Sequence, residues 1–167
     1  EDILELYNLG QRDFGENYVQ ELADKYEQLP KDIRWHFIGH LQSNKVKYIA
    51  PFVHLIHGVD SENLLKEINK QAVKNNRVID LLLQVHIAQE ETKFGFSEEE
   101  LENVLMRKSR SIGTSYENVQ VKGLMGMASF SDDLNKVRNE FKSLKELFDK
   151  VSLAFGIQHS ALSIEHS

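Results

Sequence analysis

The sequence predicts an α/β protein whose sheet is built from parallel strands. Segments with strand character alternate along the chain with segments whose apolar residues recur at helical spacing. No two-residue hairpin signal separates the strand-like segments, which favours crossover connections over hairpins. The segment RVIDLLLQVHIA (77–88) is a near-continuous apolar run, which is typical of a parallel strand buried on both faces.

The chain begins with a predicted helix. Ile3, Leu6 and Tyr7 form one apolar stripe, and Gly10 stands where such a helix would end. The short strand RDF (12–14) is expected next.

The third and fourth elements are a helix and a strand. Apolar residues recur at helical spacing between Val19 and Tyr26. RWHFIG (34–39) has strand character, and a further helix is expected from about Leu41 to Ala50 because Pro51 follows it.

The middle of the chain repeats the strand–helix pattern. VHLIHGV (53–59) is the next expected strand, and either Asp60 or Ser61 is suited to cap the helix that runs to about Ala72. The apolar run 77–88 then gives the strongest strand of the chain.

The last third contains two helices and two strands. Ser97 and Glu100 form a capping box that predicts a helix start. VQVKGLMGM (119–127) is the next strand, a long amphipathic helix begins near Asp132, and SALSI (160–164) is expected as the last strand.

Two architectures are compatible with this order of elements: a doubly wound open sheet and part of a (β/α)8 barrel. A complete barrel normally needs at least about 200 residues. This chain has 167 residues, shows six strand-like segments and begins on a helix. A barrel with residues missing from both ends would have this pattern, and the pattern alone leaves both architectures open.

Composition narrows the function classes. The formal charge of −6 and the absence of a basic run argue against nucleic-acid binding. The absence of cysteine excludes a disulfide scaffold, a thiolate zinc site and a cysteine nucleophile. No apolar run approaches the roughly 20 residues of a membrane helix, and the acidic start EDILELYNLG is unlike a signal peptide. We therefore expect a soluble cytoplasmic protein.

Ligand-binding residues are expected just after the strands, because both architectures bind ligands at the carboxyl ends of parallel strands. In FGEN, Asn17 is suited either to bind a ligand oxygen or to cap the next helix. In IGHLQSNK, Gly39 stands at the turn, His40 follows it, and Gln42 lies in the first turn of a helix whose N–H groups would favour an anion, although an ordinary capped helix start has the same pattern. His86 and Met125 also lie late in predicted strands and are therefore candidate ligand contacts. The alternative for both is packing in the core.

The seven histidines do not predict a metal site. His36 and His40 have the spacing of a zincin pair, but Phe37 stands where that motif needs glutamate. His54 and His57 are expected to face opposite sides of one strand.

Five stretches together resemble the pyridoxal phosphate homeostasis proteins. FGENYVQE, WHFIGHLQSNKVK, HGVDS, LLLQVHIAQEETKFGF and GLMGMASF occur in the order found in that family and span nearly the whole chain. The resemblance implies one (β/α)8 barrel like the N-terminal domain of alanine racemase, and residues 1–167 would form a single, partial barrel domain. It also implies binding of pyridoxal 5′-phosphate (PLP) through a lysine Schiff base.

The resemblance assigns cofactor-binding roles to five residues. Asn17 matches a strand-end residue near the cofactor, His40 and Gln42 line or support the mouth, His86 matches a position late in the central strand, and Met125 matches a residue near the ring. The stretch WHFIGHLQSNKVK would therefore be a βα junction at the ligand-bearing end of the barrel.

The sequence also departs from the family pattern. The VSKT-like first strand with the Schiff-base lysine has no counterpart here, nor do the MGMSGD-like and GSTxVRIG-like segments that form the phosphate cup. The ending ALSIEHS resembles a splice across such a missing piece. We expect first-strand and eighth-strand segments to be lacking, and a polypeptide of only these residues to be a poorly folded and weak, non-covalent PLP binder.

Three functions follow from the resemblance. The first is intracellular PLP homeostasis, in which a monomer without a reaction of its own binds, buffers and delivers PLP, with PLP-dependent apo-enzymes as the expected recipients. The second is a PLP-dependent racemase, for which this chain has no room for the added β-domain. The third is a fragment of the family that no longer binds PLP.

Overall fold

The computed structural model of the chain describes residues 2–87, 94–109, 116–155, 157 and 163–164. Helices and strands alternate along it in chain order. The helices are α1 (Asp2–Asn8), α2 (Val19–Gln28), η1 (Ser43–Lys45, a 3-10 turn), α3 (Val46–Ile49), α4 (Glu62–Lys74), α5 (Glu98–Ser109) and α6 (Leu134–Phe155). The strands are β1 (Asp13–Glu16), β2 (Arg34–Phe37), β3 (Leu55–Val59), β4 (Ile79–Val85), β5 (Val119–Gly126) and β6 (Ser163–Ile164).

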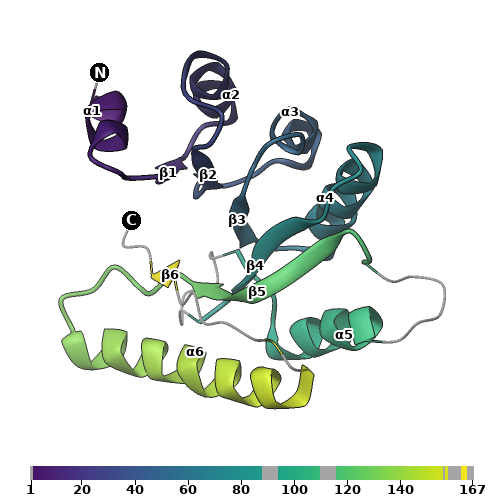
Figure 1. Ribbon diagram of the computed structural model, residues 1–167. Coiled ribbons are helices and arrows are strands. Elements are labelled where there is room, and N and C mark those ends of the chain that lie inside the picture. The colour runs from purple at the N-terminus through teal and green to yellow at the C-terminus, as the bar shows by residue number, and fades with distance from the viewer. Residues whose placement is uncertain (1, 88–93, 110–115, 156, 158–162, 165–167) are drawn as a thin grey trace.

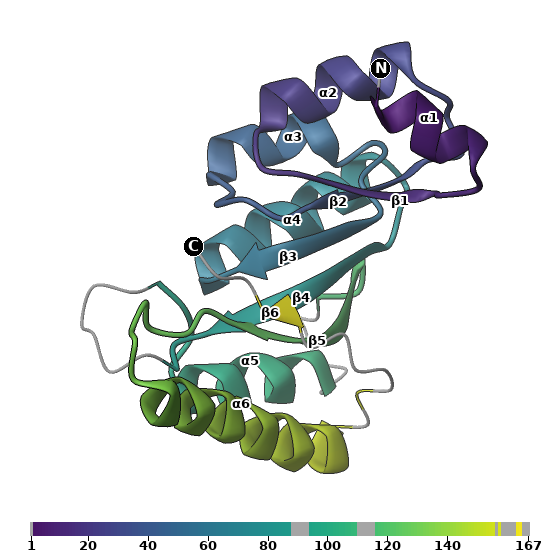
Figure 2. The same cartoon turned by 90° about the vertical axis from the view of Figure 1, so that its left-hand side faces the viewer.

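The six strands form one parallel sheet in the order β1-β2-β3-β4-β5-β6. Each strand thus lies beside its neighbour in the sequence. A doubly wound sheet reverses its strand order at a switch point, whereas a (β/α)8 barrel does not. The sheet curves with its helices along the outer side, as Figures 1 and 2 show. The prediction of an alanine racemase-like α/β barrel fold is confirmed, and the barrel is not closed within the described residues.

The two faces of the sheet carry different residues, as alternation along a strand requires. Trp35 and Phe37 of β2 are buried in the main core beneath the helices. On the inner face, Leu55, Leu82 and Met125 form a second, small cluster with Met127 packed against it. The inner face therefore has a small apolar cluster of its own, separate from the main core.

The helix starts follow the predicted capping chemistry. Ser61, rather than Asp60, is the N-cap of α4 and accepts a hydrogen bond from the backbone N–H of Leu64. Ser97 and Glu100 form the predicted capping box: each side chain accepts a hydrogen bond from the other residue's backbone N–H, at 3.2 and 2.9 Å.

One predicted helix is shorter than expected. Instead of a helix from Leu41 to Ala50, the chain forms η1 and then a single α-helical turn. Gln42 is extended at the N-cap of η1, so the first two residues of the predicted helix belong to the connection after β2.

The expectation that His54 and His57 face opposite sides of a strand is wrong. His54 precedes β3, and the register of β3 against β4 shifts between Ile56 and Val59. Both rings lie near the ring of His36 on β2, with centroid separations of 5.5 Å for His54 and 5.2 Å for His57. The strict alternation of a regular strand therefore does not hold between His54 and His57.

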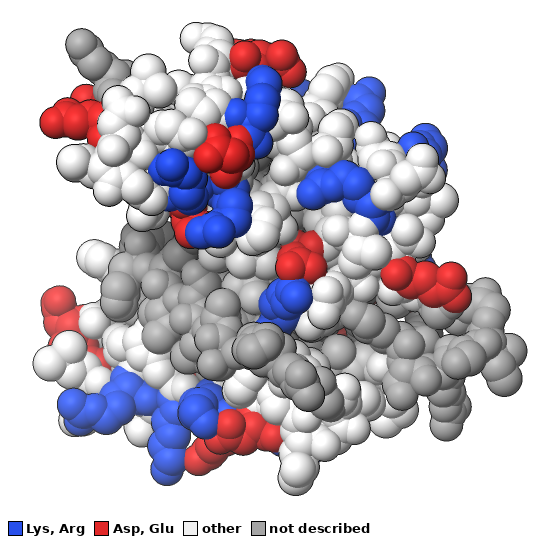
Figure 3. Space-filling view, viewed as in Figure 1, with Lys and Arg blue, Asp and Glu red and all other residues white. Residues whose placement is uncertain are grey.

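The surface has no single-sign character on the face shown in Figure 3, where basic and acidic side chains are interspersed. Among the described residues, no helix has the length and apolar character needed to cross a bilayer.

Candidate functional site

The parallel sheet brings the carboxyl ends of its strands to one edge, where α/β barrels bind their ligands. The connections that follow β1, β2 and β3 contribute polar side chains to this edge, and the segment 94–96 lies beside the end of β4. The candidate site is built from these connections.

Glu16, the last residue of β1, organises the turn that leads into α2. Its buried carboxylate accepts a hydrogen bond from the backbone N–H of Asn17 at 2.8 Å and pairs with the ammonium of Lys25 on α2. Burial alone would raise the pKa of Glu16, but Lys25 and the backbone N–H groups outweigh it, so that the pKa of this carboxyl is lowered. Glu16 is therefore ionised at neutral pH and fixes the backbone of the turn.

Asn17 follows Glu16 and is exposed at the edge. The N-cap of α2 is Tyr18, and no side chain makes a cap hydrogen bond there. Asn17 is therefore not the N-cap of α2, and its alternative role as a helix cap is ruled out.

The turns after β1 and β2 are in direct contact. A Cβ atom on Gly39 would lie 2.2 Å from the backbone oxygen of Asn17, so only glycine allows this approach. The glycine in WHFIGHLQSNK is needed to bring the two turns together.

Two adjoining pockets lie at this edge. One, of about 410 Å³, has Asn17, His40 and Gln42 among its lining residues, together with Lys45 and Tyr48. The other, of about 610 Å³, shares His40 and Gln42 and adds wall residues from η1, from the start of α4 and from the segment after β4. The connection after β2 therefore separates the two pockets.

His40 links three connections. Its Nδ1 atom lies 3.4 Å from Oδ2 of Asp60, the residue that follows β3, and its ring lies 5.4 Å from the ring of Phe94. The imidazole remains largely exposed, with 60% of its side-chain surface accessible, so it is available to a ligand.

Met125 lies deeper, on the inner face of β5. It is buried beside Leu55 and Leu82, and its Cε atom lies 3.7 Å from where a Cβ on Gly58 would stand. A Cβ on Gly58 would also lie 3.5 Å from the carbonyl oxygen of Gly39. Met125 therefore packs just inside the edge on which the pockets open.

His86 lies immediately after β4 and is exposed, so the alternative of a buried core histidine does not apply. Its backbone N–H donates to the carbonyl of Phe96 at 3.1 Å. Gly95, with a φ of +145°, is needed here, since a Cβ would lie 2.6 Å from the backbone nitrogen of His86.

The structure thus brings Asn17, His40 and Gln42 together in one pocket, whereas Met125 and His86 line neither of the two pockets. Sequence reasoning missed Gln84, a buried inner-face residue whose amide donates to the carbonyl of Phe94 at 3.0 Å. It shares its face of β4 with Leu82, two residues earlier, so alternation along the strand was the signal that would have found it.

These residues suit a flat polar ligand. The amides of Asn17 and Gln42 and the imidazole of His40 offer both donors and acceptors, and Tyr48 and Phe94 offer aromatic faces. Of the described wall residues of the two pockets, Lys45 alone carries an ammonium, and it is exposed. The described walls therefore fit an aromatic ring with polar substituents better than they fit a phosphate dianion.

Comparison with protein families and curated proteins gives a consistent result. Residues 2–166 match the family described as alanine racemase, N-terminal domain. Proteins named pyridoxal phosphate homeostasis protein are similar to this chain: that of Aquifex aeolicus is 41% identical over 99% of the chain, and that of Haemophilus influenzae is 32% identical over 89%. The chain spans 72% of the first protein and 62% of the second, so it covers less than two thirds of the latter.

Solved structures show the same likeness. PipY of Synechococcus elongatus with PLP bound has a TM-score of 0.79 and 30% identity, over 93% of this chain and 71% of PipY. An alanine racemase from Clostridium difficile has a TM-score of 0.72 at 13% identity, covering 99% of this chain and 41% of the racemase. The racemase likeness is one of fold alone.

Proposed function

The chain belongs to the pyridoxal phosphate homeostasis protein family, with the fold of the alanine racemase N-terminal domain, and we propose that it binds PLP and serves intracellular PLP homeostasis. In this role it binds, buffers and delivers the cofactor, with PLP-dependent apo-enzymes as recipients, and it acts as a monomer. The proposal includes a cytoplasmic location for the protein.

One observation carries the proposal: Asn17, His40 and Gln42, which come from two different connections, line one pocket at the carboxyl edge of the sheet. A PLP ring has a pyridine nitrogen, a phenolic oxygen and an aldehyde, and these side chains can donate to or accept from each of them. We assign Asn17, His40 and Gln42 to the polar substituents, and Met125 and His86 to supporting positions around the ring. When bound, PLP would supply an electrophilic aldehyde.

The described residues do not favour a reaction at this site. Acid–base catalysis needs a proton-transferring group held in place against the substrate. His40, the imidazole of the pocket wall, is largely exposed, and the ion-pair partner that the described residues give it is the carboxylate of Asp60. We therefore propose binding without turnover, with a racemase-type activity as the alternative that the experiment separates.

The test is a titration of the full-length protein with PLP, followed by absorbance and by racemisation of L-alanine. We expect saturable binding and no racemisation. The double variant His40→Ala/Gln42→Ala should bind PLP more weakly, whereas Lys66→Ala, a change at an exposed residue of α4 that lines neither pocket, should not.

The possible results separate the three functions. Racemisation at a rate that depends on bound PLP would replace the homeostasis role by the racemase role. If the folded protein shows no saturable binding of PLP, the third function holds, and the chain is a member of the family that no longer binds the cofactor.

A further inference from the structure

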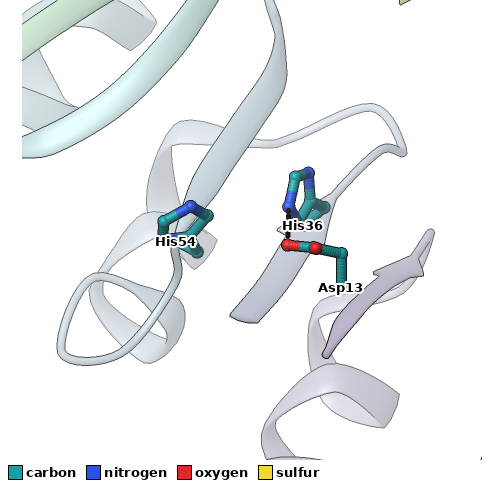
Figure 4. Close-up of side chains that lie close together, drawn as sticks. All are labelled: Asp13, His36 and His54. Atoms are coloured by element: carbon teal, nitrogen blue, oxygen red, sulfur yellow. Dashed lines mark hydrogen bonds and ion pairs between the residues drawn. The ribbon is translucent and has the colours of Figure 1, made fainter. Parts of the chain in front are cut away.

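A second cluster of polar side chains lies near the starts of β1 and β3, whereas the PLP pocket lies beyond the ends of β1 and β2. It consists of Asp13, the first residue of β1, His36 on β2 and His54 just before β3 (Figure 4). One ligand atom from each of the three lies within 4.8 Å of the others. Asp13 precedes Asn17 by four residues, which in a strand corresponds to about 13 Å.

We propose that Asp13, His36 and His54 form a binding site for a divalent first-row transition metal ion, with Zn²⁺ as the ion that fits best. Two imidazoles and one carboxylate are typical ligands of such ions, whereas Ca²⁺ and Mg²⁺ prefer oxygen ligands throughout. Three protein ligands leave a fourth tetrahedral position for water.

The geometry is close to that of a bound site. Zinc bonds of 2.0–2.1 Å in a tetrahedron place neighbouring ligand atoms about 3.3 Å apart. Nε2 of His36 already lies 3.2 Å from Oδ1 of Asp13. His54 stands outside the regular strand and is exposed, and its ligand nitrogen lies within 4.8 Å of the ligand atoms of the other two residues.

A fourth residue, His57, orients the central ligand. Its Nε2 atom lies 2.9 Å from Nδ1 of His36. The carboxylate of Asp13 can only accept, so without metal Nε2 of His36 carries the hydrogen and Nδ1 accepts from His57. When a metal ion binds Nε2 of His36, the hydrogen of this ring moves to Nδ1 and is donated to Nε2 of His57, and the hydrogen of His57 moves from Nε2 to its own Nδ1. A ligand histidine with a hydrogen-bond partner on its other nitrogen is the usual arrangement at metal sites.

The charge states at neutral pH suit coordination. Hydrogen bonds from Arg34 are the main cause that lowers the pKa of Asp13 to about 2, so the carboxylate is ionised. The imidazole of His54 is exposed but partly desolvated by its neighbours, and this desolvation lowers its pKa, which keeps its lone pair available. Arg34 opposes the metal, because its guanidinium donates to Asp13 at 2.7 Å and adds a positive charge beside the site.

The experiment is calorimetric titration of the tag-free full-length protein with Zn²⁺ near neutral pH, with Co²⁺ absorbance as the report on coordination. We expect one Zn²⁺ per chain and the visible bands of tetrahedral Co²⁺. His36→Gln and His54→Gln should abolish binding, and His57→Gln should weaken it by about 10–100-fold. His40→Gln, which removes a histidine beside a different carboxylate, should bind as the parent does.

A matched pair separates ligation from fold. Asp13→Asn and Arg34→Gln break the same ion pair, but only the first removes a ligand. Asp13→Asn should lose Zn²⁺ binding, and Arg34→Gln should bind Zn²⁺ more tightly than the parent. If His36→Gln does not fold by circular dichroism, His54→Gln carries the test, because His54 lies outside the strand. Absence of Zn²⁺ binding by the folded parent, or equal loss in the matched pair, would overturn the proposal.

Discussion

Asn17 owes its position to its neighbour rather than to its own side chain. The carboxylate of Glu16 holds the backbone N–H of Asn17, and Gly39 packs against its backbone oxygen. The side chain makes no cap hydrogen bond at α2, so it is available to a ligand. The sequence identified Asn17 as a strand-end residue, but the choice between cap and ligand contact depends on where α2 begins, which periodicity fixes only to within a residue or two.

The first prediction concerns Asn17→Ala in the full-length protein. We expect weaker PLP retention without loss of folding, because one hydrogen bond, worth about 0.5–1.5 kcal/mol, disappears. Equilibrium dialysis against PLP measures this change. Gln20→Ala is the control: it removes an amide from the same pocket wall that already donates to Asp24 at 3.0 Å. Equal PLP affinities of Asn17→Ala and the parent would count against the assigned role.

The second prediction concerns Glu16 and pH. The pKa of Glu16 is lowered in the folded state, so the unfolded chain binds the proton more readily. The stabilisation is complete above the ordinary carboxyl pKa of about 4.3 and is lost as the pH falls through the lower folded-state pKa. Glu16→Gln should cost about 1 kcal/mol at neutral pH and reduce the loss of stability on acidification.

Urea unfolding at a series of pH values measures this effect. Glu21→Gln is the matched control, because Glu21 also faces Lys25 but has 55% of its side chain exposed, and we expect little change from it. Parallel pH profiles for Glu16→Gln and the parent would show that the buried carboxylate does not stabilise the turn.

At the scale of elements, local signals predicted the helices well. The capping box at Ser97 and the cap at Ser61 involve residues three apart, so the sequence contains the whole interaction. The helix after β2 was predicted too long because Gln42 is extended, and its neighbours are held by contacts with other connections. The positions of His54 and His57 were missed because a register shift in β3 depends on its neighbour β4.

The third prediction concerns the connection after β5. Glu140, buried on α6, accepts hydrogen bonds from the backbone N–H and the hydroxyl of Ser129, each at 2.7 Å. Glu140→Ala leaves a buried N–H of Ser129 without this partner, which should lower the free energy of unfolding by about 1–3 kcal/mol. Glu146→Ala on the same helix removes an exposed carboxylate that lies 3.7 Å from Lys142 and should cost less than about 0.5 kcal/mol.

Chemical denaturation followed by circular dichroism compares the two variants of α6. A loss of stability of similar size in both would mean that helix propensity, rather than the Glu140–Ser129 contact, determines the result.

At the scale of the whole molecule, the order of the strands decides the architecture. Periodicity describes each element alone, and it left a doubly wound sheet and a partial barrel equally open. Strand order depends on contacts between residues far apart in the chain, such as Trp35 with Phe14, whose ring centroids lie 6.1 Å apart. The resemblance to a known family supplied this non-local information, and the sequential parallel sheet agrees with it.

The last prediction follows from the position of the pocket between connections. The walls come from the ends of β1 and β2 and the starts of α2 and α3, so a bound PLP would hold several elements together rather than one. A ligand that binds only the folded state stabilises it by about 2.7 kcal/mol at one hundred times its Kd. We therefore expect PLP to raise the unfolding midpoint of the full-length protein, and hydrogen exchange to slow at the ends of both strands together. Inorganic phosphate at the same concentration should produce a smaller rise, because it makes no contacts with a ring. The Asn17→Ala variant should need more PLP for the same rise in midpoint. Slower exchange confined to a single helix, or an equal effect of phosphate, would place the ligand elsewhere on the molecule.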